Sequence, residues 1–341
     1  MIRFGYACNN LELGEQNIRT GRTMIDRKFK IGGLQLASDI SLANAKDLLT
    51  IFKWNEANGI RLFRIGSELF PRWNHYRLED LPGINEIAGY LRAAGDFAKA
   101  HGHRITTHPG MFHILGSPEA RIVDNSLVSL ERHSELFDIM GFVPSFENKI
   151  NIHIGATYND KDATIARWLK NWDRLSDSCK ARLVIENDDK ASMYSVRDLY
   201  ERVHSQIGIP ITFDYWHHTF NTGDLTEEQA FLMARETWEK HGITQCTHYS
   251  ESKRRESQKL IELMFEHHGI AIEDLDKWPS FQKQYKQFTK IKEQAHADYI
   301  LALPNTYGVF DLDIVVEAKA KEQALIQVGV ECCKTSMILA D

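Results

Sequence analysis

The stretch IPITFDYWHH, residues 209–218, sets a pattern that other parts of the chain repeat. Its apolar first half, rich in β-branched residues, predicts a short buried strand. Pro210 suits the first residues of a strand, where a missing backbone donor does little harm. Asp214 would take the last position of the strand and His217 the turn beyond it, so that a carboxylate and an imidazole lie together as metal ligands. One such pair is common, and the case for a metal depends on its repetition.

Short apolar runs alternate with longer amphipathic segments along the chain. Runs with strand character are Ile2–Ala7, Ile60–Gly66, Arg104–His108, Ile150–Gly155, Arg182–Glu186, Ile209–Asp214, Ile243–His248 and Asp313–Glu317. Helical patterns cover Asn44–Asn58, Ile84–His101, Val123–Met140, Ala163–Leu175, Ser195–Gln206, Glu227–His241 and, before a loose tail, Glu322–Val328. Strand–helix alternation requires parallel pairing, so eight units predict a closed (β/α)8 TIM barrel, with a doubly wound α/β sheet as the alternative.

Composition and charge narrow the class of protein. The 341 residues are 43% hydrophobic with a formal net charge of −6, which allows a full core and gives no overall attraction to nucleic acid. No apolar run is long enough to span a membrane, and the N-terminus has strand rather than signal-peptide character. Five cysteines without a CxxC pair indicate a reducing, cytoplasmic environment. We expect residues 1–341 to form one domain, and we expect the protein to be a monomer.

An insertion at about residues 250–300 is expected between the seventh and eighth strands. Within it, Asp274–Lys292 interleaves lysines with aromatic residues. This composition fits a nucleic-acid surface or an ordinary amphipathic helix with its aromatics toward the core. We favour the amphipathic helix. Gly59, Gly102 and Gly242 each follow a helical pattern and are expected to end it.

Histidines and carboxylates recur at or just beyond the C-terminal ends of the second to eighth strands, the face where a barrel builds its active site. A dry cluster of six imidazoles and three carboxylates would be unfavourable without cations. Nine ligands suit two or three ions better than one, and the histidines favour Mn, Zn or Fe over Mg or Ca. The candidate ligands are His75, His108, His153, Glu186, Asp214, His217, His248, His296 and Glu317.

Other polar residues have weaker signals. Asn187 and Asp188 are candidates for holding the ligands in place. The basic run Lys253, Arg254 and Arg255 follows the seventh strand on the same face, where it could contact phosphates. A further set of histidines falls in helical patterns and is expected at the surface: His133, His204, His241, His267 and His268.

Short motifs spread over nearly the whole chain resemble the UV damage endonuclease family, which is similar in fold and metal layout to endonuclease IV. The motifs are Gly5-Tyr6-Ala7-Cys8 with Asn10, Phe63–Gly66 with His75, Thr107–Gly110, Ile152–Gly155, Ile185–Asp188, Asp214 with His217 and His218, His248, and Val316–Lys319 with Glu322. The resemblance implies a TIM barrel that binds up to three divalent ions, usually manganese, with zinc, cobalt or magnesium as alternatives.

The resemblance also implies a DNA repair activity on damaged double-stranded DNA. The backbone would be hydrolysed by metal-activated water immediately 5′ to UV photoproducts, pyrimidine dimers and 6-4 photoproducts, with some action at abasic sites. Glu186 lies in the middle of the ring and is our candidate bridging ligand, and Glu186, His248 and Lys253 are the candidate catalytic residues. Tyr6 and Asn10 match residues that the family places beside the lesion.

Two positions depart from the family pattern. The family commonly has Gln-Tyr after His-Pro-Gly as a wedge into the duplex, and here the pair is Met111-Phe112, which keeps an aromatic face without the polar reach. Some members have a modifiable lysine two residues before His248, where this chain has Cys246. Alternatives to an endonuclease for UV photoproducts are an abasic-site nuclease similar to endonuclease IV, a metal-dependent sugar isomerase or epimerase on the same barrel, and a non-catalytic metal- or DNA-binding module.

Overall fold

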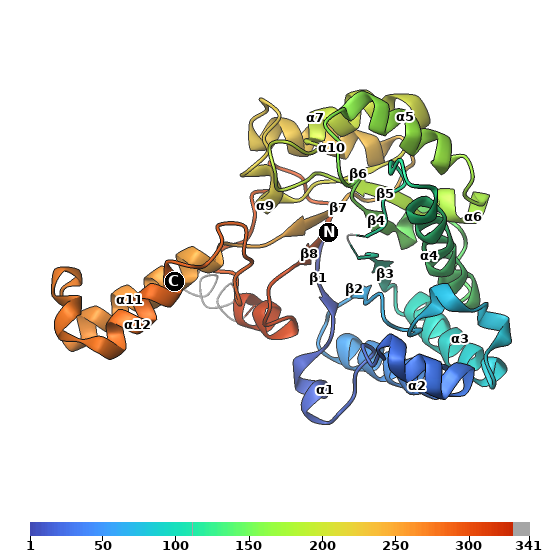
Figure 1. Ribbon diagram of the computed structural model, residues 1–341, viewed down its shortest axis with the longest axis horizontal. Helices are drawn as coiled ribbons and strands as arrows, with labels where there is room; N and C mark the ends of the chain where they lie inside the picture. The colour runs from blue at the N-terminus through green and yellow to red at the C-terminus, as the bar shows by residue number, and fades with distance from the viewer. Residues whose placement is uncertain (111, 330–341) are drawn as a thin grey trace.

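Parallel strands form the centre of the molecule in a computed structural model that describes residues 1–110 and 112–329 (Figure 1). They are β1 (Ile2–Cys8), β2 (Leu62–Ile65), β3 (Arg104–Thr107), β4 (Ile150–Ile152), β5 (Leu183–Glu186), β6 (Ile211–Thr212), β7 (Cys246–Tyr249) and β8 (Leu312–Val316). Their order is β6-β5-β4-β3-β2-β1-β8-β7, and every ladder is parallel. The predicted (β/α)8 fold is confirmed. Met111, the expected tail, Cys332 and Cys333 lie outside the described residues.

The barrel closes between β6 and β7 at its C-terminal face. No ladder joins these strands among the described residues, and the connection is a single parallel bridge between Asp214 and His248. The amide of His248 donates to the carbonyl of Phe213 at 2.9 Å. Two predicted metal ligands therefore make the contact that closes the barrel.

Helices surround the strands (Figure 1). The main ones are α2 (Asp26–Ala57), α3 (Ile84–Ala100), α4 (Ala120–Ile139), α5 (Lys161–Trp172) and α10 (Glu227–Glu239). The predicted helix Asn44–Asn58 is the second part of α2, which continues upstream across non-helical backbone at Gly33 (φ 57°, ψ −149°). Leu48, Ile51, Phe52 and Asn55 recur at helical spacing on the buried face of α2.

Shorter elements complete the ring. The predicted helix Ser195–Gln206 consists of α7 (Val196–Leu199), a π-helical turn (Tyr200–His204) and α8 (Ser205–Ile207), and residues 322–329 are helical as expected. Gly59, Gly102 and Gly242 follow their helices with φ of 70°, 66° and 66°, which confirms them as helix-ending residues. Other short elements are α1 (Leu11–Glu15), α6 (Asp177–Lys180), α9 (Tyr215–His218) and the 3-10 turns Trp73–His75, Leu78–Asp80 and Phe146–Asn148.

The insertion between β7 and β8 extends away from the barrel as a helical arm (Figure 1). It contains α11 (Lys253–His268), a 3-10 segment (Ile272–Lys277) and α12 (Pro279–Phe288). Phe281 and Tyr285 of α12 pack on a small separate core that contains Phe265 of α11. The amphipathic interpretation is confirmed for Phe281 and Tyr285, which face α11 and not the barrel, whereas Trp278 is 46% exposed. Within the described part of the chain, no helix is long and apolar enough to cross a membrane.

Candidate metal centre

Asp214 occupies a helix cap beyond the end of its strand. Since β6 ends at Thr212, Asp214 is not the last strand residue that the sequence predicted, and His217 lies in α9 instead of a turn. The Oδ1 atom of Asp214 accepts the amide hydrogen of His217 at 2.8 Å and so starts the helix. Its other oxygen, Oδ2, is buried and makes no hydrogen bond. A buried carboxylate oxygen without a donor is a position that a cation would satisfy.

Three groups of side chains bring potential ligand atoms within 4.8 Å of one another. The first is His108, Glu186 and His248, the second His153, Glu186 and His217, and the third Asp214, His248 and Glu317. Glu186 and His248 each belong to two groups. The groups therefore form one continuous cluster at the C-terminal face, where the sequence placed the site.

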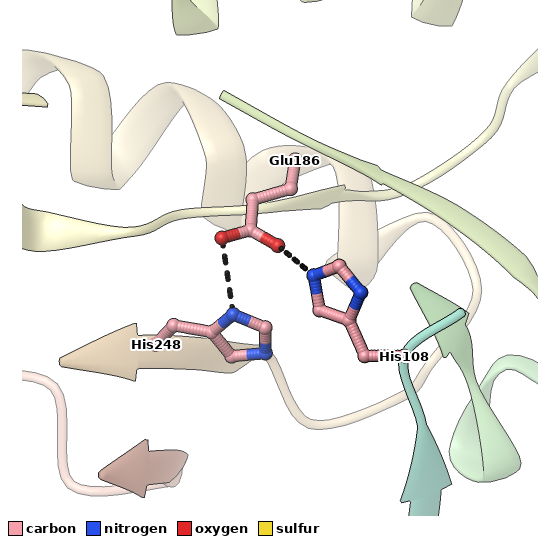
Figure 2. A group of neighbouring side chains, drawn as sticks. All are labelled: His108, Glu186 and His248. Carbon is pink, nitrogen blue, oxygen red and sulfur yellow. Dashed lines mark hydrogen bonds and ion pairs between the residues drawn. The ribbon is translucent and has the colours of Figure 1, made fainter. Parts of the chain in front are cut away.

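Glu186 is the central residue of this cluster. Figure 2 shows its two carboxylate oxygens facing different histidines, His108 from the end of β3 and His248 from β7, each at 3.1 Å. The carboxylate also lies 3.4 Å from Nδ1 of His217 and 3.8 Å from Nε2 of His153. One carboxylate thus faces four imidazoles, which is the geometry expected of a ligand shared between ions.

Glu317 forms the second carboxylate junction, at the end of β8. Its oxygens lie 3.3 Å from Nδ1 of His248 and 3.6 Å from Nδ1 of His296. The guanidinium of Arg64, on β2, pairs with the same carboxylate. His296 is therefore adjacent to the cluster, although it belongs to none of the three groups found among the described residues.

The cluster has a closed floor and an open rim. The side chains of Glu186, Asp214 and His248 are at most 1% exposed. Those of His108, His153, His217, His296 and Glu317 are 13–25% exposed. A ligand that approaches the C-terminal face would contact the partly exposed rim residues first, because the floor residues are buried.

Electrostatics keep two of the carboxylates ionised. Burial alone would raise the pKa of Glu186, but the charges and hydrogen bonds of His248, His153 and His108 hold it well below the usual value. Burial likewise acts to raise the pKa of Glu317, and Arg64 and His248 outweigh it and lower that pKa. Both side chains thus remain anionic ligands at neutral pH.

Three further residues of the cluster respond differently to these charges and to burial. Burial raises the pKa of Asp214 to about 7, assisted by the negative charges of Glu186 and Glu317. Burial lowers the pKa of His248 to about 3, since Glu186 compensates only in part. For His153, burial is outweighed by Glu186 and Asp188, and its pKa rises to about 10. Without a cation the cluster therefore retains protons on Asp214 and His153.

His75 is the predicted ligand that lies farthest from this arrangement. It ends a 3-10 turn (Trp73–His75), is exposed, and has its ring 5.7 Å from that of Phe29. Within residues 1–110 and 112–329 it joins none of the three ligand groups. It lines a hollow of about 500 Å³ together with Phe112, His113 and His133. Its role as a ligand stays a prediction.

The predicted lesion contacts differ in accessibility. Tyr6 and Asn10 are at most 1% exposed. The Tyr6 hydroxyl donates to Oδ1 of Asn55 at 2.7 Å and accepts from Asn10 at 2.9 Å, while Asn10 also caps α1. Contact of either residue with DNA would require these elements to rearrange. Phe112, by contrast, is 81% exposed, and its predicted partner Met111 lies outside the described residues.

The basic run that follows β7 begins a helix. Lys253, Arg254 and Arg255 form the first turn of α11. A bridge between Ser252 and His296 holds this turn beside the cluster. Lys253 is bound to Asp298 at 2.6 Å and to Glu256 at 2.8 Å, and Arg254 pairs with Glu293 at 3.0 Å. Among the described residues, Arg255 has an exposed side chain without an ion-pair partner.

Two of the histidines expected at the surface are buried, and that prediction is wrong for them. His133 is 1% exposed with Nδ1 donating to the carbonyl of Ser129 at 2.8 Å, and His204 is 4% exposed with Nδ1 donating to the carbonyl of Ile209 at 2.9 Å. In each case a backbone acceptor allows the neutral ring to be buried. His241, His267 and His268 are exposed as predicted.

Several residues that hold the ligands were not identified from the sequence. Asn151 donates to Oε2 of Glu186, Arg64 pairs with Glu317, and Lys149 reaches His248. Asn151 precedes His153 by two residues, so the two-residue period of a strand places both on the same face and could have indicated it. Asn187 and Asp188 were identified, and they contact the cluster: the Asn187 carbonyl accepts from Nδ1 of His217 at 2.9 Å, and Asp188 lies 3.2 Å from Nδ1 of His153.

The fold and the cluster define an eight-stranded parallel barrel with a histidine–carboxylate centre on its C-terminal face. The chain belongs to the UV-endonuclease UvdE family, whose model matches residues 2–338. A UV-damage endonuclease of Schizosaccharomyces pombe is 32% identical over 338 residues, which are 95% of this chain and 50% of that protein. A UV DNA damage endonuclease of Bacillus pumilus is 28% identical over 335 residues, 95% of this chain and 92% of that protein.

A solved structure agrees with this assignment. The crystal structure of SacUVDE aligns with a TM-score of 0.74 and 27% identity, and 95% of each chain is covered. The chain spans about half the length of the S. pombe relative, and 41% of a Neurospora crassa UV-damage endonuclease that is 33% identical to it.

Proposed function

We propose that the cluster binds two or three divalent cations and that manganese is the preferred metal. The three groups of potential ligands overlap through Glu186 and His248, so one ion could not use all of them. The unpartnered Oδ2 of Asp214 fits a cation, as does a buried Glu186 surrounded by imidazoles. Mixed nitrogen and oxygen donors favour Mn²⁺, Zn²⁺ or Co²⁺ over Mg²⁺.

We infer that the protein is an endonuclease that hydrolyses the backbone of damaged duplex DNA on the 5′ side of UV photoproducts. The observation that carries this proposal is the place of Glu186 in two ligand groups, because residues so arranged would hold more than one divalent cation, and such cations would supply the Lewis acidity that hydrolysis of a phosphodiester needs. Family membership supplies the class of substrate. The open rim leaves room for a backbone phosphate to reach the cluster.

The chain's own residues would hold the reacting groups in place. Bound divalent cations would supply Lewis acidity, which activates water and neutralises charge that develops on the phosphate. Glu186 and His248, each in two ligand groups, would fix the relative positions of the ions. Arg255, whose side chain is exposed in the first turn of α11, would contact a phosphate, and Lys253 would do so only on leaving Asp298 and Glu256. Choice of lesion would follow from the lower free energy needed to unstack a distorted dinucleotide.

The proposal is tested with an end-labelled duplex irradiated with UV light. With Mn²⁺ we expect one cleavage site immediately 5′ to each photoproduct, and we expect chelation of the metal to abolish cleavage. A duplex with a synthetic abasic site tests whether a second type of damage is cut. Equal cleavage of irradiated and intact duplex, or none in the presence of Mn²⁺, would contradict the proposal.

Replacing Lys253, Arg254 and Arg255 together by alanine should weaken binding to damaged and intact duplex alike, since phosphate contacts carry no lesion information. Each lost contact flattens the dependence of log affinity on log salt by about 0.9. We expect a total change of about one contact rather than three, because Lys253 is already paired with Asp298 and Glu256 and Arg254 is already paired with Glu293. Affinity measured over a series of salt concentrations gives this slope.

A matched variant removes the same charge from the opposite face. Arg61 directly precedes β2, Lys99 and Lys240 lie at the C-terminal ends of α3 and α10, and each is also paired with a carboxylate. Alanine at these three positions should leave the salt slope as in the wild type. If both triple variants flatten the slope equally, net charge and not the first turn of α11 governs binding.

Metal affinity should increase with pH, because the metal-free cluster carries protons that a cation must displace. Burial raises the pKa of Asp214 to about 7, and Glu186 and Asp188 raise that of His153 to about 10 against the effect of burial. Below pH 7 both groups lose a proton on binding, and above it only His153 does. Competition with a metal-binding dye should therefore give a steeper pH dependence below neutrality, whereas a flat profile would contradict the assignment.

A further inference from the structure

Lys149 is an amine enclosed in the interior of the barrel. It directly precedes β4, its backbone carbonyl accepts the amide hydrogen of Thr107, and its side chain is 0% exposed. Nζ contacts Oγ1 of Thr212 at 2.8 Å, Oδ1 of Asn151 at 3.1 Å and Nε2 of His248 at 3.2 Å. These partners stand on or beside β6, β4 and β7, so one amine connects strands on both sides of the point where the barrel closes.

The surroundings of Lys149 distinguish it from an ordinary buried lysine. A buried cation is normally paired with a carboxylate, because an unpaired charge in the interior is strongly unfavourable. None of the ion pairs among the described residues involves Lys149. Its partners are neutral groups, and two of them, Asn151 and His248, belong to or touch the metal cluster. Hydrogen bonds to these neutral groups, and not a salt bridge, therefore set the position of the Lys149 amine.

The contact with His248 fixes the orientation of that ring. Nε2 faces Lys149, and Nδ1 faces Glu186 at 3.1 Å and Glu317 at 3.3 Å. Whichever of the two nitrogens carries the shared hydrogen, the contact keeps Nδ1 directed into the cluster. A second partner on the far side of a ligating histidine commonly sets its orientation in metal sites.

Through its contact with Asn151, Lys149 also helps to fix the position of the Glu186 carboxylate. The Oδ1 atom of Asn151 accepts from Lys149, which leaves its amide nitrogen to donate to Oε2 of Glu186. A flipped amide would place two donors opposite each other at Lys149, so the amine fixes which end of Asn151 faces the carboxylate. The two residues that each belong to two ligand groups are thus both held through Lys149.

We propose that Lys149 is a positioning residue of the metal centre, which holds His248 directly and Glu186 through Asn151. The inference rests on the proposed metal binding of the cluster, but not on the identity of the DNA substrate. Its consequence is that loss of the amine changes metal affinity and geometry in the absence of DNA.

Lys149→Met tests the proposal with a side chain of similar length and no hydrogen-bonding group. Loss of residues that hold metal ligands typically reduces metal affinity about ten- to hundredfold, and we expect a loss of that size for Mn²⁺ in competition with a metal-binding dye. The absorption spectrum of the Co²⁺-loaded protein should also change, because it reports ligand geometry. Thr106→Val is the control: Thr106 is equally buried on neighbouring β3, and its hydroxyl has no hydrogen-bond partner.

Circular dichroism and thermal unfolding establish whether the variant folds. If Lys149→Met folds and keeps wild-type Mn²⁺ affinity and Co²⁺ spectrum, the proposal is overturned. If it does not fold, Thr212→Val decides, because it removes one anchor of the amine and should cause a smaller loss of affinity with a changed spectrum, whereas an unchanged Thr212→Val protein overturns the proposal. Failure of the wild type to bind Mn²⁺ or Co²⁺ would instead contradict metal binding by the cluster.

Discussion

Glu186→Gln is expected to lower cleavage of UV-irradiated duplex by at least about a thousandfold, which corresponds to about 4 kcal/mol of lost transition-state stabilisation. The carboxylate faces His108 with one oxygen and His248 with the other. Glutamine keeps one oxygen and replaces the second by an amide nitrogen, which cannot bind a cation. Since Glu186 belongs to two ligand groups, this single change damages both.

A matched variant tests whether burying an amide in place of a carboxylate is by itself enough to lower cleavage. Glu322 is 0% exposed and accepts from the amides of Leu11 and Glu12, away from the cluster. Glu322→Gln should fold and cleave like the wild type, because an amide oxygen can accept the same hydrogen bonds. Thermal unfolding and metal content per chain should accompany the kinetics. A folded Glu186→Gln protein with wild-type cleavage would exclude Glu186 as a shared ligand.

The barrel could be predicted because its signals are local. Apolar runs, amphipathic segments and glycines at helix ends recur along the chain, and parallel pairing follows from their alternation. Boundaries set by tertiary contacts were less predictable. β6 ends at Thr212 because Asn187 binds both backbone groups of Asp214. Those contacts come from the residue that follows β5 and cannot be inferred from residues 209–218.

The ligand cluster was predictable for the same reason, because the C-terminal ends of parallel strands converge on one face. The groups that hold the ligands were harder to foresee. Lys149 and Arg64 reach the cluster from within or across the barrel, and nothing near them in sequence indicates their partners. The burial of Tyr6 depends on Asn55 of α2, which is distant in the chain. The order of the strands is enough to predict that their C-terminal ends meet on one face. Which side chains are buried around them depends on packing between segments that are distant in sequence.

Phe112→Ala is expected to lower affinity for damaged duplex about ten- to hundredfold, because stacking of an aromatic ring on a base contributes about 1–3 kcal/mol. Phe112 is 81% exposed and follows the His108-Pro109-Gly110 turn beside the cluster. The next residue anchors the loop, since Nε2 of His113 lies 2.6 Å from the hydroxyl of Ser129. An exposed aromatic on a loop anchored at both ends is well placed to enter the gap left by an extruded lesion.

The comparison with tyrosine tests whether the ring face alone matters. Phe112→Tyr should bind damaged duplex like the wild type, because the aromatic face is kept and only a hydroxyl is added. Intact duplex should be bound equally by all three proteins, since it offers no gap for the ring to fill. Titration of each protein with irradiated and intact duplex at one salt concentration measures both effects.

Phe310 provides the control for loss of an exposed aromatic. It is 79% exposed and lies just before β8, at the opposite end of the barrel from the cluster. Phe310→Ala should change neither lesion affinity nor thermal stability. Phe112→Ala should also unfold at the wild-type temperature, because a side chain that is 81% exposed contributes little to the core. If it instead lowers the unfolding temperature and leaves lesion binding intact, Phe112 packs its loop, and another residue must fill the gap in the duplex.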